Sequence, residues 1–255
     1  MKTYFKIHYE FDRESVHDAI EQRLAQPGSD YICVADGVIL NIANRTPEYL
    51  KVVNSGMFCI CDSSYVPLYI RLIHGERHEQ YCGSQIFLDI VGSCKYRMIF
   101  LGTQQHILDG LKENLKKLNP DVEGMKFVEL PFCDVPQFDY PAIARMIEED
   151  GADIVWVALG APKQEYFMSC LKPHLRHGVM LAVGAAFKFF SGVDSSRAPQ
   201  WMIDHHLEFV HRLSKEPKKQ FRRCYRIVTT LPGLLYTEWK RKKKTGDEAG
   251  TALAR

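Results

Sequence analysis

Short apolar runs alternate along the chain with amphipathic segments of helical spacing, and this alternation constrains the fold more than any other feature of the sequence. The runs that are mostly apolar and end near a turn residue are Tyr31–Val34, Met57–Cys61, Tyr96–Leu101, Lys126–Leu130, Asp153–Leu159 and Val179–Val183. Strands of this kind are typical of a parallel sheet that is buried on both faces. The sequence therefore predicts an α/β fold, with a mostly parallel, Rossmann-like sheet and helices on both of its faces.

Capping signals mark several helices between these runs. The segment Thr46–Glu48 has the order of an N-cap, a first-turn proline and an acidic first-turn residue, and Gly56 would end that helix. Ser63 or Ser64 could cap the next helix, which Gly75 would close. These signals place helices between the predicted strands, as a parallel sheet requires.

In parallel α/β sheets, ligands bind beyond the carboxyl ends of the strands. This rule places Asp62 and several glycine-containing turns along one candidate edge; the turns are Gly102–Thr103, Gly160–Glu165 and Gly184. A strand followed by glycine and the first turn of a helix leaves backbone N–H groups that can bind phosphate. Any one of these glycines could instead be an ordinary turn residue. The sequence lacks both G-x-G-x-x-G and G-x-x-x-x-G-K-[ST], which argues against a dinucleotide fingerprint and a P-loop.

Charge is distributed unevenly, although the net charge is only +2. Residues 201–255 hold 13 Lys and Arg against 6 Asp and Glu, whereas residues 1–200 have a balance of −5. Such a basic segment suits an anionic partner, which could be lipid headgroups, phosphates or nucleic acid. We therefore divide the chain into an α/β core, residues 1–199, and a basic appendage, residues 200–255. We expect the appendage to be helical and its C-terminal tail to be disordered.

The N-terminal segment is charged throughout and lacks the apolar centre of a signal peptide. No apolar run reaches the roughly 20 residues that a membrane-spanning helix needs. We therefore expect a cytoplasmic protein. His, Cys and carboxylate residues show no metal-site spacing, so we also expect no bound metal and no cofactor.

The most specific signal is a series of motifs within residues 159–217. In chain order they are Gly160-Ala161-Pro162-Lys163-Gln164-Glu165, Arg197-Ala198-Pro199, Leu207-Glu208 and Arg212-Leu213. In these motifs and their spacing the chain resembles the WecG/TagA/CpsF family of bacterial glycosyltransferases, and weaker similarity extends back to about residue 30. The resemblance implies inverting transfer from a UDP-sugar to an undecaprenyl-diphosphate-linked acceptor in cell-surface polysaccharide synthesis, without a bound metal. The sugar would be of the N-acetylmannosamine type, its uronic acid, or glucose.

The resemblance also implies a catalytic base. The family has a T-x-N strand end followed by an aspartate, its proposed general base, and Asp62 holds this position 28 residues after Val34. A carboxylate near the acceptor hydroxyl can take its proton during attack. Asp62 could equally cap the next helix. Asp36 stands where the family has the asparagine and is a second candidate carboxylate, although Asp36 followed by Gly37 also fits a hairpin-like turn.

The candidate donor-binding residues are Gly102, Thr103, Gly160, Pro162, Gln164, Glu165 and Gly184. Gln164 and Glu165 follow a proline that can begin a helix, and their amide and carboxylate could bind sugar or ribose hydroxyls. An acidic residue is also favourable by itself in the first turn of a helix. That alternative would explain Glu165 without a ligand but gives no reason for Gln164.

The appendage interleaves basic and aromatic residues around a short apolar run, 227–239, which Lys240–Lys244 follow. This pattern suits a segment that lies on an anionic membrane surface. The resemblance implies that the appendage docks peripherally on the inner face of the cell membrane and that arginines in and just before it hold the acceptor's diphosphate. The candidates are Arg197, Arg212, Arg222 and Arg223. A nucleic-acid-binding arm is the rival interpretation, but no recognition fold accompanies it, so we expect no nucleic-acid partner. A homo-oligomer is compatible with an exposed appendage.

Two other classes of function are compatible with the sequence. An enzyme that modifies a nucleotide-sugar would turn over the donor without a lipid acceptor. A non-catalytic membrane adaptor with the same fold would bind lipid but no donor. The residues that depart from the family's usual ones are Val34, Asp36, Ser63 and Lys188, so the donor sugar, the acceptor's terminal sugar and the linkage stay open.

Overall fold

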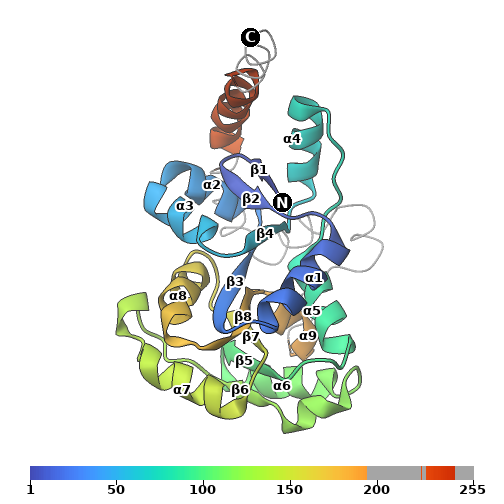
Figure 1. The fold of residues 1–255 in the computed structure, drawn as a ribbon, viewed down its shortest axis with the longest axis vertical. Coiled ribbons are helices and arrows are strands. Elements are labelled where there is room, and N and C mark those ends of the chain that lie inside the picture. The colour runs from blue at the N-terminus through green and yellow to red at the C-terminus, as the bar shows by residue number, and fades with distance from the viewer. Residues whose placement is uncertain (194–224, 226–227, 245–255) are drawn as a thin grey trace.

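The computed structural model describes residues 1–193, 225 and 228–244, and within these ranges eight strands form a single sheet (Figure 1). The strands are β1 (Lys2–Tyr4), β2 (Ile7–Tyr9), β3 (Gly28–Ala35), β4 (Phe58–Cys61), β5 (Met98–Gly102), β6 (Lys126–Val128), β7 (Ile154–Ala158) and β8 (His177–Ala182). The helices labelled in Figure 1 are α1 (Arg13–Leu24), α2 (Gly37–Arg45), α3 (Pro47–Asn54), α4 (Tyr65–His74), α5 (Gly83–Gly92), α6 (Gln105–Leu115), α7 (Tyr140–Asp150), α8 (Lys163–Leu171) and α9 (Ala186–Ser191). A further helix, called the C-terminal helix below, spans residues 228–244.

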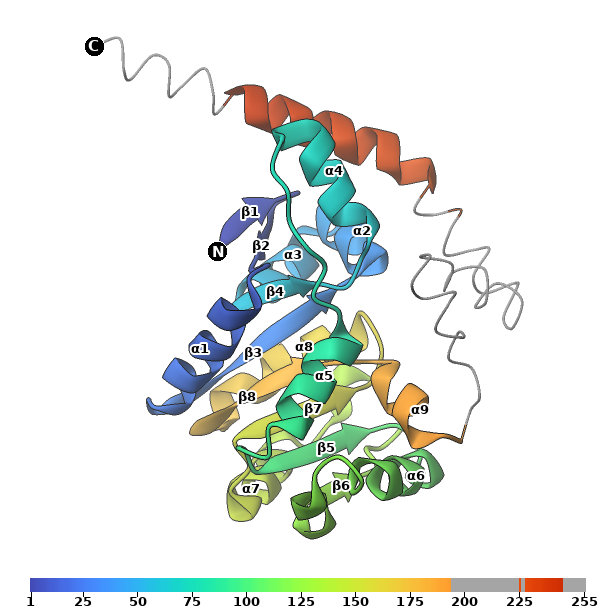
Figure 2. The same cartoon turned by 90° about the vertical axis from the view of Figure 1, so that its right-hand side faces the viewer.

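The strand order is β1-β2-β4-β3-β8-β7-β5-β6, and β1 pairs antiparallel with β2. The other strand pairs in this sheet are parallel. The carboxyl ends of the central strands therefore meet at one edge, toward which the arrows of β3, β8, β7 and β5 point in Figure 2. The predicted α/β fold with a mostly parallel sheet is confirmed.

Side chains of the central strands alternate between two hydrophobic cores, one on each face of the sheet. In β5, Ile99 and Leu101 pack into one core and Met98 and Phe100 into the other. The first core takes buried side chains from α2, α3, α4, α7 and α8, and the second from α1, α5, α6 and α9. Figure 1 shows α8 on one side of the strands and α1 and α5 on the other. Because both faces are covered, the strands are apolar at nearly every position.

The six predicted strands correspond to β3–β8, with ends shifted by a few residues. Helix α3 begins at Pro47, and α4 ends at Gly75, whose φ of 79° is left-handed, as the capping signals predicted. The sequence patterns did not identify β1, β2 or α1.

The alternative of a hairpin-like turn at Asp36 is wrong, because Asp36 is the N-cap of α2. Its Oδ1 atom accepts hydrogen bonds from the backbone N–H groups of Val38 and Ile39, at 2.8 and 2.9 Å. Aspartate is a preferred N-cap because its carboxylate satisfies backbone donors that have no partner within the first helical turn. The capping chemistry of Asp36 therefore outweighs the turn preference of the Asp-Gly pair.

The C-terminal helix packs on the core next to the end of α4 (Figure 2). The Asn41 amide of α2 donates to the Thr230 hydroxyl, and Leu235 packs against the first hydrophobic core. Among the described residues, no helix combines the length and apolar character needed to span a membrane. The tail that we expect to be disordered lies outside the described residues.

Candidate functional site

Asp36 and Asp62 lie side by side at the carboxyl edge of the sheet. Each is the first residue beyond its strand, and the last residues of these strands, Ala35 and Cys61, are paired in the parallel register of β3 and β4. The Asp62 N–H donates to the Ala35 carbonyl oxygen at 3.0 Å, which extends the strand pairing by one residue. The fold thus places two aspartates on neighbouring strand ends, although they come from segments that are distant in the sequence.

The Asp62 carboxylate caps a helix, but not the one that follows it in the chain. Its Oδ1 atom accepts a hydrogen bond of 2.8 Å from the N–H of Gly83, the first residue of α5. A Cβ atom on Gly83 would lie only 2.9 Å from Cγ1 of Val34. Glycine therefore lets α5 approach the strand ends closely enough to hold the Asp62 carboxylate.

The boundary between β3 and β8 is a topological switch point of the sheet. These strands are neighbours, yet α2 follows β3 onto one face of the sheet and α9 follows β8 onto the other. Where the connections of adjacent strands diverge in this way, an open crevice forms beyond their carboxyl ends and commonly binds ligands. Asp36 lies at the β3 side of this crevice and Gly184 at the β8 side.

Gln164 lies between the turns that follow β7 and β8. Its Oε1 atom accepts a hydrogen bond of 3.0 Å from the Gly160 N–H, and its Nε2 atom donates to Glu165 at 2.9 Å. The same Oε1 atom lies 3.5 Å from the position that a Cβ atom on Gly184 would take. The Gln164 amide is therefore bonded to the β7 turn and lies next to Gly184 of the β8 turn.

Glu165 is fully buried beneath this edge. Its Oε2 atom accepts a hydrogen bond of 3.0 Å from the Tyr49 hydroxyl of α3, while Gln164 donates to its Oε1 atom. Burial raises the pKa of Glu165 to about 7, with a smaller contribution from the negative charge of nearby Asp36. The Glu165 carboxyl group thus ties α3 to α8 from inside the protein.

The turn after β5 completes the edge. Gly102 has a φ of 111°, and a Cβ atom there would lie 2.7 Å from the Ala158 carbonyl oxygen of β7. Thr103 follows with a φ of 57°, also in the left-handed region. Pro162 stands directly before α8, in the turn that begins at Gly160. The predicted donor-binding residues therefore gather along the ends of β5, β7 and β8.

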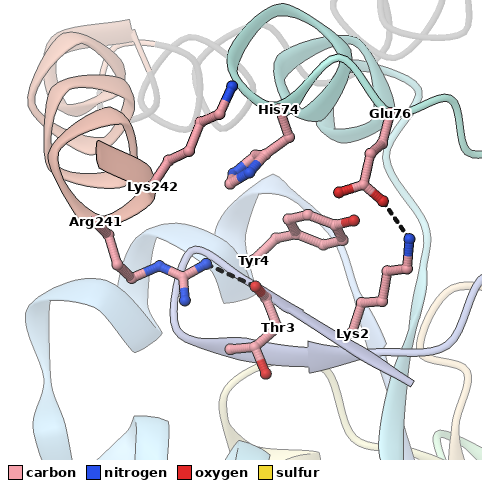
Figure 3. Close-up of a pocket in the computed structure, with 7 residues that line it drawn as sticks. All are labelled: Lys2, Thr3, Tyr4, His74, Glu76, Arg241 and Lys242. Carbon is pink, nitrogen blue, oxygen red and sulfur yellow. Dashed lines mark hydrogen bonds and ion pairs between the residues drawn. The ribbon is translucent and has the colours of Figure 1, made fainter. Parts of the chain in front are cut away.

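The four arginines proposed for the acceptor's diphosphate, Arg197, Arg212, Arg222 and Arg223, lie outside the described residues. Within the described ranges, no group of three or more His, Cys, Asp and Glu side chains is placed to hold a metal ion. A cavity of about 470 Å³ lies away from the carboxyl edge, where β1, the end of α4 and the C-terminal helix meet (Figure 3). Its lining residues are Lys2, Thr3, Tyr4, His74, Glu76, Arg241 and Lys242.

Two residues of this edge, Tyr49 and Gly83, were not among the sequence candidates. Tyr49 bonds to Glu165 across 116 positions of the chain, and no local pattern links the two residues. Gly83 carried a usable signal, because a glycine directly before an apolar helical segment can allow close packing of that helix on a strand end.

Comparisons with known proteins place this geometry in context. The family model described as "Glycosyl transferase WecG/TagA/CpsF family" matches residues 5–246. A curated protein of Bacillus spizizenii, named "N-acetylglucosaminyldiphosphoundecaprenol N-acetyl-beta-D-mannosaminyltransferase", is 28% identical over 218 residues, which are 84% of this chain and 82% of that protein. A protein of the same name from Bacillus subtilis is 26% identical over 204 residues, or 79% of this chain and 75% of the relative. The family match spans both the carboxyl edge and the C-terminal helix.

Proposed function

Because the chain belongs to the WecG/TagA/CpsF family of glycosyltransferases, we propose that it transfers an N-acetylmannosamine-type sugar from a UDP-sugar to N-acetylglucosamine on undecaprenyl diphosphate. The acceptor and the sugar are those named for its two Bacillus relatives. The observation that carries the proposal is the position of Asp62, next to Asp36 at the ends of β4 and β3 and at the same edge of the sheet as the Gly160 and Gly184 turns. An inverting transferase needs a carboxylate base and a donor pocket within reach of each other.

In the proposed reaction, a hydroxyl oxygen of the acceptor sugar attacks the anomeric carbon of the donor. The bond between that carbon and the UDP oxygen breaks, and UDP leaves with the electron pair. Asp62 accepts the proton of the attacking hydroxyl, because a sugar hydroxyl is a poor nucleophile until its proton is being removed. Attack on the face opposite UDP inverts the anomeric configuration.

The donor's diphosphate would lie against the turns after β5, β7 and β8. Free backbone N–H groups at such strand-to-helix turns are suited to phosphate oxygens. The turn residues that we assign to the donor are Gly102, Thr103, Gly160, Pro162 and Gly184. Pro162 has no N–H group and the Gly160 N–H is bonded to Gln164, so these two would shape the turn rather than donate to phosphate. Gln164 would contact the donor from the β7 turn, and buried Glu165 would position Gln164 rather than touch the sugar.

The acceptor's diphosphate would be held by Arg197, just before the appendage, and by Arg212, Arg222 and Arg223 of the appendage. A guanidinium group can donate two parallel hydrogen bonds to a phosphate, which makes arginine the suitable residue for this task. The basic run Lys240–Lys244 would keep the protein at the inner face of the membrane, where the lipid-linked acceptor resides.

A direct assay tests the proposal. Purified protein is incubated with a panel of UDP-sugars and a short-chain analogue of N-acetylglucosaminyl-diphospho-undecaprenol, and the disaccharide-lipid product is followed by mass spectrometry. We expect acceptor-dependent transfer that is fastest with UDP-N-acetylmannosamine. Donor turnover without the acceptor would favour a nucleotide-sugar-modifying enzyme, and vesicle binding without donor binding would favour a non-catalytic adaptor.

A further inference from the structure

Exposed apolar side chains are concentrated at one end of the molecule. In the part of the chain that the structure describes, eleven large hydrophobic residues are exposed, and seven of them belong to α4 and the C-terminal segment. These seven are Tyr65, Leu68, Leu72, Tyr225, Val228, Tyr236 and Trp239. Both helices lie at the same end of the molecule in Figures 1 and 2. A cluster of this kind marks a surface that contacts a partner.

Helix α4 is apolar on two sides, and only one of them is covered. Val66 and Ile70 are buried in the first hydrophobic core. Tyr65, Leu68 and Leu72 follow the spacing i, i+3, i+7, so they share one face, and their exposed fractions are 53%, 46% and 73%. This outer face of α4 presents two leucines and a tyrosine to the surroundings.

The C-terminal helix has a matching outer face. Val228, Tyr236 and Trp239 follow the spacing i, i+8, i+11, which is one stripe of a helix, and about half or more of each side chain is exposed. Its inner face holds Leu235, which packs on the core, and Glu238, which is buried. The exposed apolar stripe therefore lies on the outside of a helix whose inner face is packed on the core.

The two helices are joined at their ends. Buried Glu238 accepts hydrogen bonds from His74 of α4 at 3.0 Å and from Arg241 at 2.6 Å. Lys242 donates to the Ile73 carbonyl oxygen at 2.7 Å and so caps the C-terminus of α4. Figure 3 shows His74, Arg241 and Lys242 around the cavity at the junction. These bonds join the C-terminal end of α4 to the C-terminal helix. We call the exposed apolar faces of the two helices, taken together, the composite surface.

The composite surface is basic as well as apolar. Exposed Lys240 lies 4.8 Å from the centre of the Tyr236 ring, and exposed Lys243 lies 5.8 Å from that of Trp239. The single carboxylate of residues 228–244, Glu238, is turned into the core. Arg71 adds an exposed cation on α4. Aromatic side chains beside lysines and leucines are the composition of helices that lie in the headgroup region of an anionic bilayer.

We propose that α4 of the core contacts the anionic bilayer together with the C-terminal helix, so that the membrane-docking surface is shared between two segments far apart in the sequence. The inference rests on the membrane docking included in the proposed function and adds a core element to it. Leu68 and Leu72 enter the interfacial region of the bilayer, and the lysines of the C-terminal helix lie against lipid phosphates.

Vesicle binding of the full-length protein tests this proposal. Flotation with vesicles of phosphatidylglycerol and phosphatidylcholine compares the wild type with the double variants L68E/L72E and Y236E/W239E. Each leucine side chain that inserts into the bilayer strengthens vesicle binding by roughly tenfold. We therefore expect L68E/L72E to bind vesicles at least about 100-fold more weakly than the wild type. The control is L118E, because Leu118 is 42% exposed, much like Leu68, but follows the far end of α6. We expect it to bind like the wild type.

The outcomes separate this inference from the proposed function. If Y236E/W239E loses binding while L68E/L72E behaves like L118E, α4 is not part of the surface, although the membrane docking stands. If neither pair loses binding, docking through this end of the molecule is refuted as well. A third outcome is that L68E/L72E binds vesicles like the wild type but sediments as a monomer where the wild type sediments as a dimer. In that case the α4 face joins two copies of the chain, and the inference fails. Transfer to a water-soluble acceptor should be unchanged in L68E/L72E, which verifies that the variant is folded.

Discussion

Asp62 is the residue on which the proposed chemistry depends, and its carboxylate is held by the Gly83 N–H at 2.8 Å. Asparagine at position 62 keeps an oxygen that can accept the hydrogen bond from Gly83. Its amide group, however, cannot take the proton of the attacking sugar hydroxyl. We therefore expect Asp62→Asn to lower turnover roughly 10²–10⁴-fold with little change in donor affinity. Steady-state transfer and calorimetric nucleotide binding, measured on the same preparation, distinguish the two effects.

Asp36→Asn is the matched control for this substitution. Asparagine is as good an N-cap as aspartate, so the bonds to Val38 and Ile39 that start α2 can be kept. We expect this variant to retain most of the wild-type turnover. A greater loss at position 36 than at position 62 would make Asp36 the catalytic base.

Glu165 makes the stability of the protein depend on pH. Burial raises its pKa from the ordinary 4.5 to about 7, so the folded state binds the proton more tightly than the unfolded chain. The stability that this group contributes is therefore complete below pH 4.5 and is lost as the pH rises toward 7. The shift corresponds to roughly 3 kcal/mol. Measured by urea unfolding, the free energy of unfolding should fall more between pH 5 and pH 8 in the wild type than in Glu165→Gln. An equal fall in the two proteins would contradict this prediction.

At the scale of the element, the position of α5 depends on Gly83. A Cβ atom there would meet Val34 at 2.9 Å, so Gly83→Ala must push the start of α5 away from Asp62. Overpacking of this kind lowers the free energy of unfolding by on the order of 1–3 kcal/mol. Displacement of the Asp62 carboxylate should also lower turnover. Gly92→Ala, at the other end of α5, meets only the flexible Leu118 side chain at 3.3 Å and serves as the control. Equal turnover in the two variants would show that the start of α5 does not position Asp62.

At the scale of the whole molecule, Glu238 holds the C-terminal helix on the core through His74 and Arg241. We expect Glu238→Ala to speed amide hydrogen exchange in residues 228–244 and to leave the exchange of the central strands unchanged, because local openings follow local contacts. Glu48→Ala, which removes an exposed carboxylate in the first turn of α3, is the control. Uniformly faster exchange throughout the chain would mean that Glu238 supports the whole fold rather than this helix.

The sequence by itself determined the layered α/β fold and the edge at which the candidate site lies. It could do so because strands covered on both faces are apolar at successive positions, and because turns and capping residues are local signals. The motif at Gly160–Glu165 likewise identified the turn after β7 without any structure.

Only the tertiary structure decided which of these segments meet. The strand order β4-β3-β8-β7 differs from the chain order, and it sets Asp36 beside Asp62 and Gln164 beside Gly184. The same holds for His74 and Glu238, which bond across 164 positions of the chain. Such contacts arise from the packing of complete elements, and since no short segment of the sequence contains both partners, local patterns cannot specify them.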